Sequence, residues 1–192
     1  MSRIEWLAVV FMLALAMALV VYLSPSGEDA AARRAACVAN LSRIGQAMAS
    51  YLEASDDHWP AVAKLESLAV HDPPWPMLPE VLKPYLKGMG VFRCPADSRT
   101  LAPDSRLAQR FPRRTTYFDT EGTSYEWLFG ENYAGKKVGT ELMSRSEGFG
   151  LGAADQPILR DFDLFHTGDG GGPLNTLYAD LNARSARGSS RP

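Results

Sequence analysis

The residues best suited to chemistry lie close together near the carboxyl-terminal end of the chain. Four aspartates and one histidine surround the glycine-rich stretch 168–172. Oxygen ligands on a flexible turn suit calcium, so calcium is the one metal that we consider for this segment. The spacing matches no calcium-binding loop, and imidazole is a poor calcium ligand. We therefore favour a solvated turn with the histidine hydrogen-bonded to the backbone, and we expect no cofactor. The candidate ligands are Asp161, Asp163, His166, Asp169 and Asp180.

Two cysteines form the second group of reactive side chains. Cys37 and Cys94 are the only cysteines of the chain. In an oxidising compartment an even cysteine count predicts a disulfide, and this one would fasten the globular part of the chain to a helix. Two buried free thiols are the alternative, because free cysteine is often fully buried. No Cys-x-x-Cys motif or paired zinc-type spacing is present, so the spacing supports neither zinc nor thioredoxin-like chemistry.

Motifs that would indicate an enzyme are missing. Histidines occur only at positions 58, 71 and 166. The chain has no Gly-x-Ser-x-Gly elbow, no His-Glu-x-x-His helix and no phosphate-binding Gly-Lys-Ser/Thr loop. A serine, a histidine and an aspartate could still meet in space, because catalytic triads are recognised by geometry. We predict that the protein is not an enzyme.

The elements that position these residues begin with an apolar run. Residues 4–23 are hydrophobic except for Glu5, and 6–23 would span about 27 Å as a helix. This length nearly crosses a bilayer core, so 1–25 is predicted to be a membrane-spanning anchor helix. Arg3 before the run and acidic residues directly after it place the rest of the chain outside the cytoplasm. A cleaved secretory signal ending near Ser26 is the alternative.

A second helix is predicted over 26–57, with a kink near Pro25. Its apolar residues recur at steps of three and four, which indicates one buried helical face. The polar residues, Arg34 among them, are assigned to the opposite face. The apolar positions are Cys37, Leu41, Ile44, Met48 and Tyr51.

Short strands are expected in the remainder of the chain, at 115–118, 124–129, 157–161 and 176–179. They predict an α+β fold in which the long N-terminal helix packs on a small, mainly antiparallel sheet. The domains would be the anchor at 1–25, the amphipathic stem helix at 26–57, the head at 58–184 and a disordered tail at 185–192. A pI of 5.9 and a net charge of -2 do not favour nucleic acid as a partner.

An ordered set of short stretches resembles the type IV pilin-like proteins called pseudopilins. Within that group, the chain is similar to the prepilin-type bacterial family whose C-terminal domain carries a histidine and an Asp-Gly signature. The resemblance spans nearly the whole chain. The stretches are 4–10 (IEWLAVV), 32–41 (ARRAACVANL), 44–48 (IGQAM), 59–60 (WP), 82–86 (LKPYL), 91–97 (VFRCPAD), 123–125 (TSY) and 175–180 (NTLYAD).

The resemblance implies a structural subunit of a type II secretion or type IV pilus-like assembly. Its partners would be other pilin-like subunits and the inner-membrane assembly platform. The protein would be a single-pass protein of the bacterial inner membrane with its C-terminal domain in the periplasm. In such fibres the residue matching Glu5 pairs with the terminal amine of a neighbouring subunit, which would make Glu5 an assembly residue. A headgroup-level position for Glu5 is the alternative.

Two departures from the family pattern leave other functions open. Met1 stands where the family's first mature residue would stand, without the usual basic leader. Either the true start lies upstream, or the protein is anchored without processing. In addition, Asp180-Leu181-Asn182 replaces the family's Asp-Gly-His. A non-assembling, membrane-anchored periplasmic binding module is therefore the alternative function, and a periplasmic hydrolase is a third class.

Overall fold

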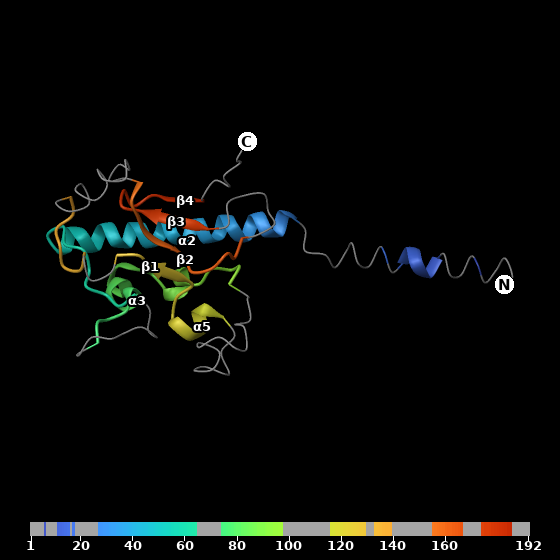
Figure 1. Ribbon diagram of the computed structural model, residues 1–192, viewed down its shortest axis with the longest axis horizontal. Helices are drawn as coiled ribbons and strands as arrows, with labels where there is room; N and C mark the ends of the chain where they lie inside the picture. Colours follow the sequence, from blue (N-terminus) through green and yellow to red (C-terminus); the bar gives the residue numbers. More distant parts are fainter. Residues whose placement is uncertain are drawn as a thin grey trace.

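The fold is built from one long helix and one small sheet (Figure 1). The computed structural model describes residues 6, 11–15, 17, 27–64, 74–97, 116–129, 133–139, 155–166 and 174–185. The long helix is α2 (Gly27–Ala54), and the strands are β1 (Tyr125–Trp127), β2 (Pro157–Asp161), β3 (Asn175–Tyr178) and β4 (Ala183–Ser185). The short helical segments are α3 (Leu78–Leu82), η2 (Lys83–Tyr85), η3 (Met89–Phe92) and α5 (Tyr117–Glu121).

Helix α2 has one buried side, as the apolar spacing of its sequence predicts. Cys37, Leu41, Ile44 and Met48 are fully buried, whereas Tyr51 is only partly buried. The helix ends where the backbone of Asp56 turns to a φ of 54°, a left-handed conformation that aspartate tolerates better than most residues.

The four strands form an antiparallel sheet in the order β1-β2-β3-β4. This arrangement agrees with the predicted α+β layout with an antiparallel sheet. Strand β4 is an addition to the predicted strands, and its last residue, Ser185, lies in the segment predicted to be the tail. The Ser185 hydroxyl donates a hydrogen bond of 2.7 Å to the side-chain oxygen of Asn175 in β3.

Close contact between α2 and the turn after β3 depends on Gly45. A Cβ atom at this position would lie 2.6 Å from the backbone oxygen of Leu181, which real Cβ atoms essentially never approach so closely. The absence of a side chain therefore lets the turn backbone rest directly on the helix.

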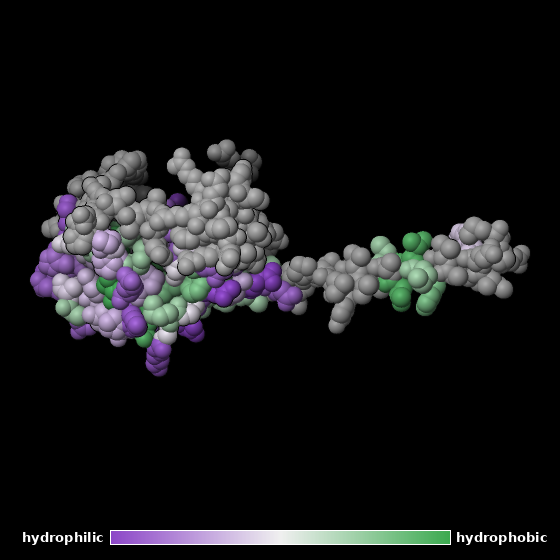
Figure 2. All heavy atoms as spheres, turned by 90° about the horizontal axis from the view of Figure 1, so that it is seen from below, coloured by the Kyte–Doolittle hydropathy of each residue, from purple (hydrophilic) through white to green (hydrophobic). Residues whose placement is uncertain are grey.

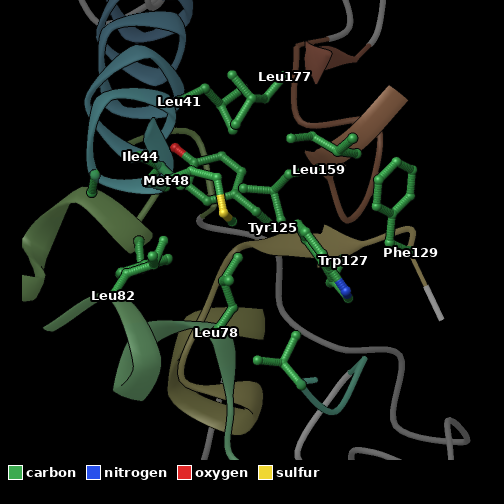
Figure 3. Close-up of a cluster of buried hydrophobic side chains, with 14 of the residues drawn as sticks. Leu41, Ile44, Met48, Leu78, Leu82, Tyr125, Trp127, Phe129, Leu159 and Leu177 are labelled. Atoms are coloured by element: carbon green, nitrogen blue, oxygen red, sulfur yellow. The ribbon is translucent and has the colours of Figure 1, made fainter. Parts of the chain in front are cut away.

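The core lies between α2, the sheet and the short helices (Figure 3). In this view side chains of α2 point toward Tyr125 of β1, and Trp127 and Phe129 extend the cluster away from the helix. The labelled members are Leu41, Ile44, Met48, Leu78, Leu82, Tyr125, Trp127, Phe129, Leu159 and Leu177.

The strand predicted at 115–118 is wrong, because α5 begins at Tyr117. The side chain of Thr116 caps this helix by accepting a hydrogen bond from the backbone N–H of Asp119. The carboxylate of Asp97 accepts two more, from the N–H groups of Tyr117 and Phe118. These acceptors satisfy the N–H groups in the first turn of the helix. The β-branched and aromatic residues at 115–118 favour a strand, and they do not reveal that these acceptors are present.

The predicted membrane-spanning helix over 1–25 requires a correction. No helix among the described residues combines the length and the apolar composition needed to cross a membrane. Of the predicted anchor, the structure describes only 6, 11–15 and 17. Helix α2 has 28 residues, but charged side chains such as Arg34 and Arg43 interrupt its apolar positions. In Figure 2 the described residues among 11–17 form a green, apolar surface.

Candidate functional site

The predicted disulfide is confirmed and forms the centre of the candidate site. Cys37 of α2 is bonded to Cys94, which follows η3, and both residues are fully buried. The alternative of two free thiols is therefore wrong. The bond joins the long helix to the turn at 94–97, so it fastens α2 to the segment that follows η3.

Two of the predicted ligand residues meet beside this disulfide. His166 Nε2 lies 3.5 Å from Cys94 Sγ and 3.5 Å from Asp161 Oδ2. Both the His166 and the Asp161 side chains are almost completely buried. Asp161 is the last residue of β2 and His166 follows five positions later, so the end of one strand brings an imidazole and a carboxylate to the disulfide.

Helix α2 contributes a cation to the same cluster. Arg34 is buried, which contradicts its predicted place on the solvent-exposed side of the helix. Its guanidinium donates a hydrogen bond of 2.6 Å to the backbone oxygen of His166. Because Arg34 precedes Cys37 by almost one helical turn, both lie on the side of α2 that faces the disulfide and His166.

Asp161 is held in an unusual electrostatic environment. Burial raises the pKa of its carboxyl to about 7. The hydrogen bond from the Asn175 backbone and the positive charge of Arg34 oppose this rise, whereas the nearby negative charge of Asp97 adds to it. The backbone N–H of Asn175 donates to Asp161 Oδ2 at 2.6 Å, and the buried Oδ1 accepts no hydrogen bond from the residues that the structure describes. Near neutral pH this carboxyl can therefore gain or lose a proton.

A second buried carboxylate, Asp97, organises the other side of the disulfide. The hydroxyl of Ser124 donates to Asp97 Oδ2 at 2.7 Å and accepts from the N–H of Cys94 at 3.1 Å. The Ser124 proton is thus directed at a carboxylate, which is not the serine–histidine pairing of a triad. Asp97, Ser124, Arg34 and Asn175 were missed in the sequence. The turn Cys-Pro-Ala-Asp at 94–97 was the available signal for Asp97.

Tyr125 closes the cluster from β1. Burial raises the pKa of its hydroxyl, and the negative charge of Asp161 raises it further. The phenol therefore stays protonated throughout the physiological range.

The remaining predicted ligands do not join Asp161 and His166. Asp163 accepts a hydrogen bond of 3.2 Å from the Tyr117 hydroxyl, and Asp180 forms an ion pair with Arg184 of β4. Asp169 and the assembly residue Glu5 lie outside the described residues. The predicted calcium ligands consequently do not form a single site in the described part of the chain.

Cys37, Cys94 and His166 make up the only metal-type cluster of three or more ligand residues in the described ranges. Their ligand atoms all lie within 4.8 Å of one another. The paired sulphurs of the disulfide are bonded to each other, so the cluster as it stands offers one imidazole and one neighbouring carboxylate.

An open groove lies on another face, between α2 and the segment from η2 to η3. Its volume is about 870 Å³, and polar side chains dominate its helix wall. Arg43 from α2 and Lys87 from the facing segment give the groove two positive charges. The other polar side chains are Asn40, Gln46 and Ser50 of α2 and Tyr85 of η2.

Comparisons with protein-family models, with curated proteins and with solved structures find nothing that matches this chain.

Proposed function

We propose that this protein is a structural, pseudopilin-like subunit of a type II secretion or type IV pilus-like assembly. The observation that carries the proposal is a set of large apolar side chains exposed ahead of α2. Phe11, Leu13 and Met17 are each more than 60% exposed. Exposed apolar side chains gathered in one segment mark an interaction surface. In an assembly the same segment of a neighbouring subunit would cover them.

Helix α2 supports the proposal through its exposed side. Between Asp29 and Arg43 this side carries small residues, which allow another helix to approach closely. They are Ala31, Ala32, Ala35, Ala36 and Ala39, all exposed. The opposite side packs on the sheet through the core and is bonded by the disulfide to the turn at 94–97, so α2 can act as a rigid stem that presents the head.

The disulfide supports a location for the head. Disulfides persist in oxidising compartments such as the bacterial periplasm and are rare in the cytosol. We therefore place the domain in the periplasm as part of this proposal. The partners it implies are other pilin-like subunits and the inner-membrane assembly platform, and the role is structural, not catalytic.

Site-specific photo-crosslinking in the native cell tests the proposal. A photoreactive residue at Leu13, in the exposed apolar segment, should form covalent products with a second copy or with other pilin-like proteins. Leu164 is a matched control, because it is an exposed leucine on the head (45% exposed). Products identified by mass spectrometry only from position 13 would support the subunit role. A Leu13 probe that captures no protein would refute it.

The polar groove favours a second candidate function, a binding module that does not assemble. Arg43 and Lys87 could neutralise an anionic ligand in a groove of this size. Native mass spectrometry of the full chain from its own host tests this function. An anionic adduct retained by the wild type and lost in Arg43→Glu would favour the binding module, whereas unmodified mass in both would exclude it.

A further inference from the structure

We propose that the cluster around the disulfide becomes a zinc site when the disulfide is reduced, with Cys37, Cys94, His166 and Asp161 as the four ligands. This inference concerns the interior of the domain and does not rest on the proposed function. Zinc is the class of cation that fits, because two thiolates with one imidazole and one carboxylate are ligands that zinc accepts, whereas calcium and magnesium prefer oxygen alone.

Distances between the ligand atoms carry the proposal. Zinc lies about 2.3 Å from sulphur and about 2.0 Å from imidazole nitrogen, so tetrahedral ligand atoms lie about 3.3 to 3.8 Å apart. The 3.5 Å between His166 Nε2 and Cys94 Sγ fits this range, and so does the 3.5 Å between the same nitrogen and Asp161 Oδ2. Cys37, Cys94 and His166 already have ligand atoms within 4.8 Å of one another, so reduction must separate the two sulphurs and the Asp161 carboxylate must move toward them to complete the set.

Asp161 provides a second, independent observation. Its Oδ1 is buried and accepts no hydrogen bond from any described residue. A buried carboxylate oxygen without a donor is costly, and a cation bound at Oδ2 of the same carboxylate, the oxygen near His166, would lower that cost by drawing off negative charge. The other oxygen is already oriented by the Asn175 N–H, which would hold the carboxylate as metal ligands are commonly held by neighbouring hydrogen bonds.

The charges of the cluster also balance. Two thiolates and one carboxylate bring three negative charges, and Zn²⁺ and the Arg34 guanidinium bring three positive charges. Arg34 already donates to the backbone oxygen of His166, so its positive charge lies beside the ligand set. A buried site is tolerated only when its charges are paired in this way.

The redox step needs a reductant, for which we name a dithiol. The dithiol gives two electrons and two protons, its own sulphurs become a disulfide, and the Cys37–Cys94 bond breaks to two thiols. Zn²⁺ then binds, and the two thiol protons pass to solvent because only thiolates coordinate zinc. Zinc binding and oxidation therefore compete for the same two sulphurs. The oxidised protein cannot bind zinc here.

The test uses the full chain in both redox states. The protein is reduced anaerobically in dilute urea by a phosphine. The phosphine takes an oxygen atom from water and becomes phosphine oxide. Dialysis then removes the urea and the phosphine. Titration with Co²⁺ and Zn²⁺ follows. The reduced wild type should bind one ion per chain with a thiolate-to-cobalt charge-transfer band and tetrahedral cobalt spectrum. The oxidised protein should bind none.

Variants identify the ligands. His166→Ala and Asp161→Asn should each weaken zinc binding at least tenfold, the scale of effect seen when metal sites lose supporting groups. Asp163→Asn is the matched control, because Asp163 lies in the same segment but accepts its hydrogen bond from Tyr117. Its zinc affinity should equal that of the wild type.

Three results would overturn the proposal. They are no stoichiometric uptake by the reduced wild type, equal affinity after His166→Ala, and uptake only by a chain without native near-ultraviolet dichroism. If His166→Ala does not fold, zinc X-ray absorption of the reduced wild type decides. Two sulphur ligands with imidazole scattering would support the site, and two sulphur ligands without it would refute the site.

Discussion

Replacing Asp161 by asparagine should change how the stability of this domain depends on pH. The carboxyl is completely buried, and burial raises its pKa from 3.8 to about 7. Asparagine has nearly the same shape and is neutral at every pH, so it resembles the protonated carboxyl. Its side-chain oxygen can still accept the hydrogen bond from the Asn175 N–H. The substitution thus removes the titration while it keeps the packing.

The sign and size of the effect follow from proton linkage. Because the folded protein holds the Asp161 proton more tightly than the unfolded chain, the folded state binds more protons between about pH 4 and pH 7. The free energy of unfolding therefore falls as pH rises through this interval. A rise of about three pKa units corresponds to about 4 kcal/mol, and this penalty is complete above pH 7. Asp161→Asn should be up to about 4 kcal/mol more stable than wild type at pH 8 and nearly equal to it at pH 4.

Equilibrium unfolding in urea measures this difference directly. The oxidised full chain and the variant would be unfolded at several values between pH 4 and pH 8.5, with tryptophan fluorescence as the signal. Equal m-values at each pH would show that the same surface is exposed on unfolding. Glu53→Gln is the control, because Glu53 is an exposed carboxylate on α2. The free energy of unfolding of Glu53→Gln should change with pH in parallel with that of the wild type.

The difference in the free energy of unfolding between wild type and variant isolates the titration of Asp161 from that of groups elsewhere in the chain. Titrating groups remote from Asp161 are present in both proteins and cancel to first order. A constant difference between the two curves from pH 4 to pH 8.5 would refute the raised pKa of Asp161. A variant that loses stability with increasing pH relative to wild type would refute the sign.

Three other substitutions test separate parts of the structure. Gly45→Ala should cost about 1 to 3 kcal/mol in thermal unfolding, because its Cβ would press on the Leu181 oxygen. Gly88→Ala, where nothing lies within 4 Å, should be nearly neutral, and equal melting of the two variants would contradict the close contact. Cys94→Ser should cost about 4 kcal/mol, because the lost disulfide links residues 57 positions apart, and wild-type stability would contradict this. Glu5→Ala should leave the domain folded by circular dichroism but impair co-purification with pilin-like subunits; unchanged co-purification would disprove the assembly role of Glu5.

The buried side of α2 and the cysteine pairing could be predicted from the sequence. Both predictions need only the spacing of residues within one helix and the number of cysteines. Leu41, Ile44 and Met48 repeat at the helical period, and two cysteines can pair in only one way. The predicted strands at 124–129, 157–161 and 176–179 also overlap β1, β2 and β3, because short runs of β-branched and aromatic residues are bounded by turn residues.

Other features depended on contacts between distant residues, which one sequence does not display. Helix α5 forms because Asp97, twenty positions before Tyr117, accepts hydrogen bonds from its first turn. Arg34 looked like a solvent-exposed residue, because charged side chains are usually exposed. Its burial follows from the position of His166, whose backbone oxygen lies 132 residues along the chain.

The polar cluster is difficult to explain as a device for stability alone. Replacing buried ionic groups with apolar residues of similar volume is often neutral or stabilising. The raised pKa of Asp161 means that its charge destabilises the domain at neutral pH. The disulfide already joins α2 to the turn at 94–97, so His166 and Asp161 are not needed for that link. The 3.5 Å distances from His166 Nε2 to Cys94 Sγ and to Asp161 Oδ2 fit reduced-state zinc binding, which would give this buried imidazole and carboxylate a chemical role beside the two sulphurs.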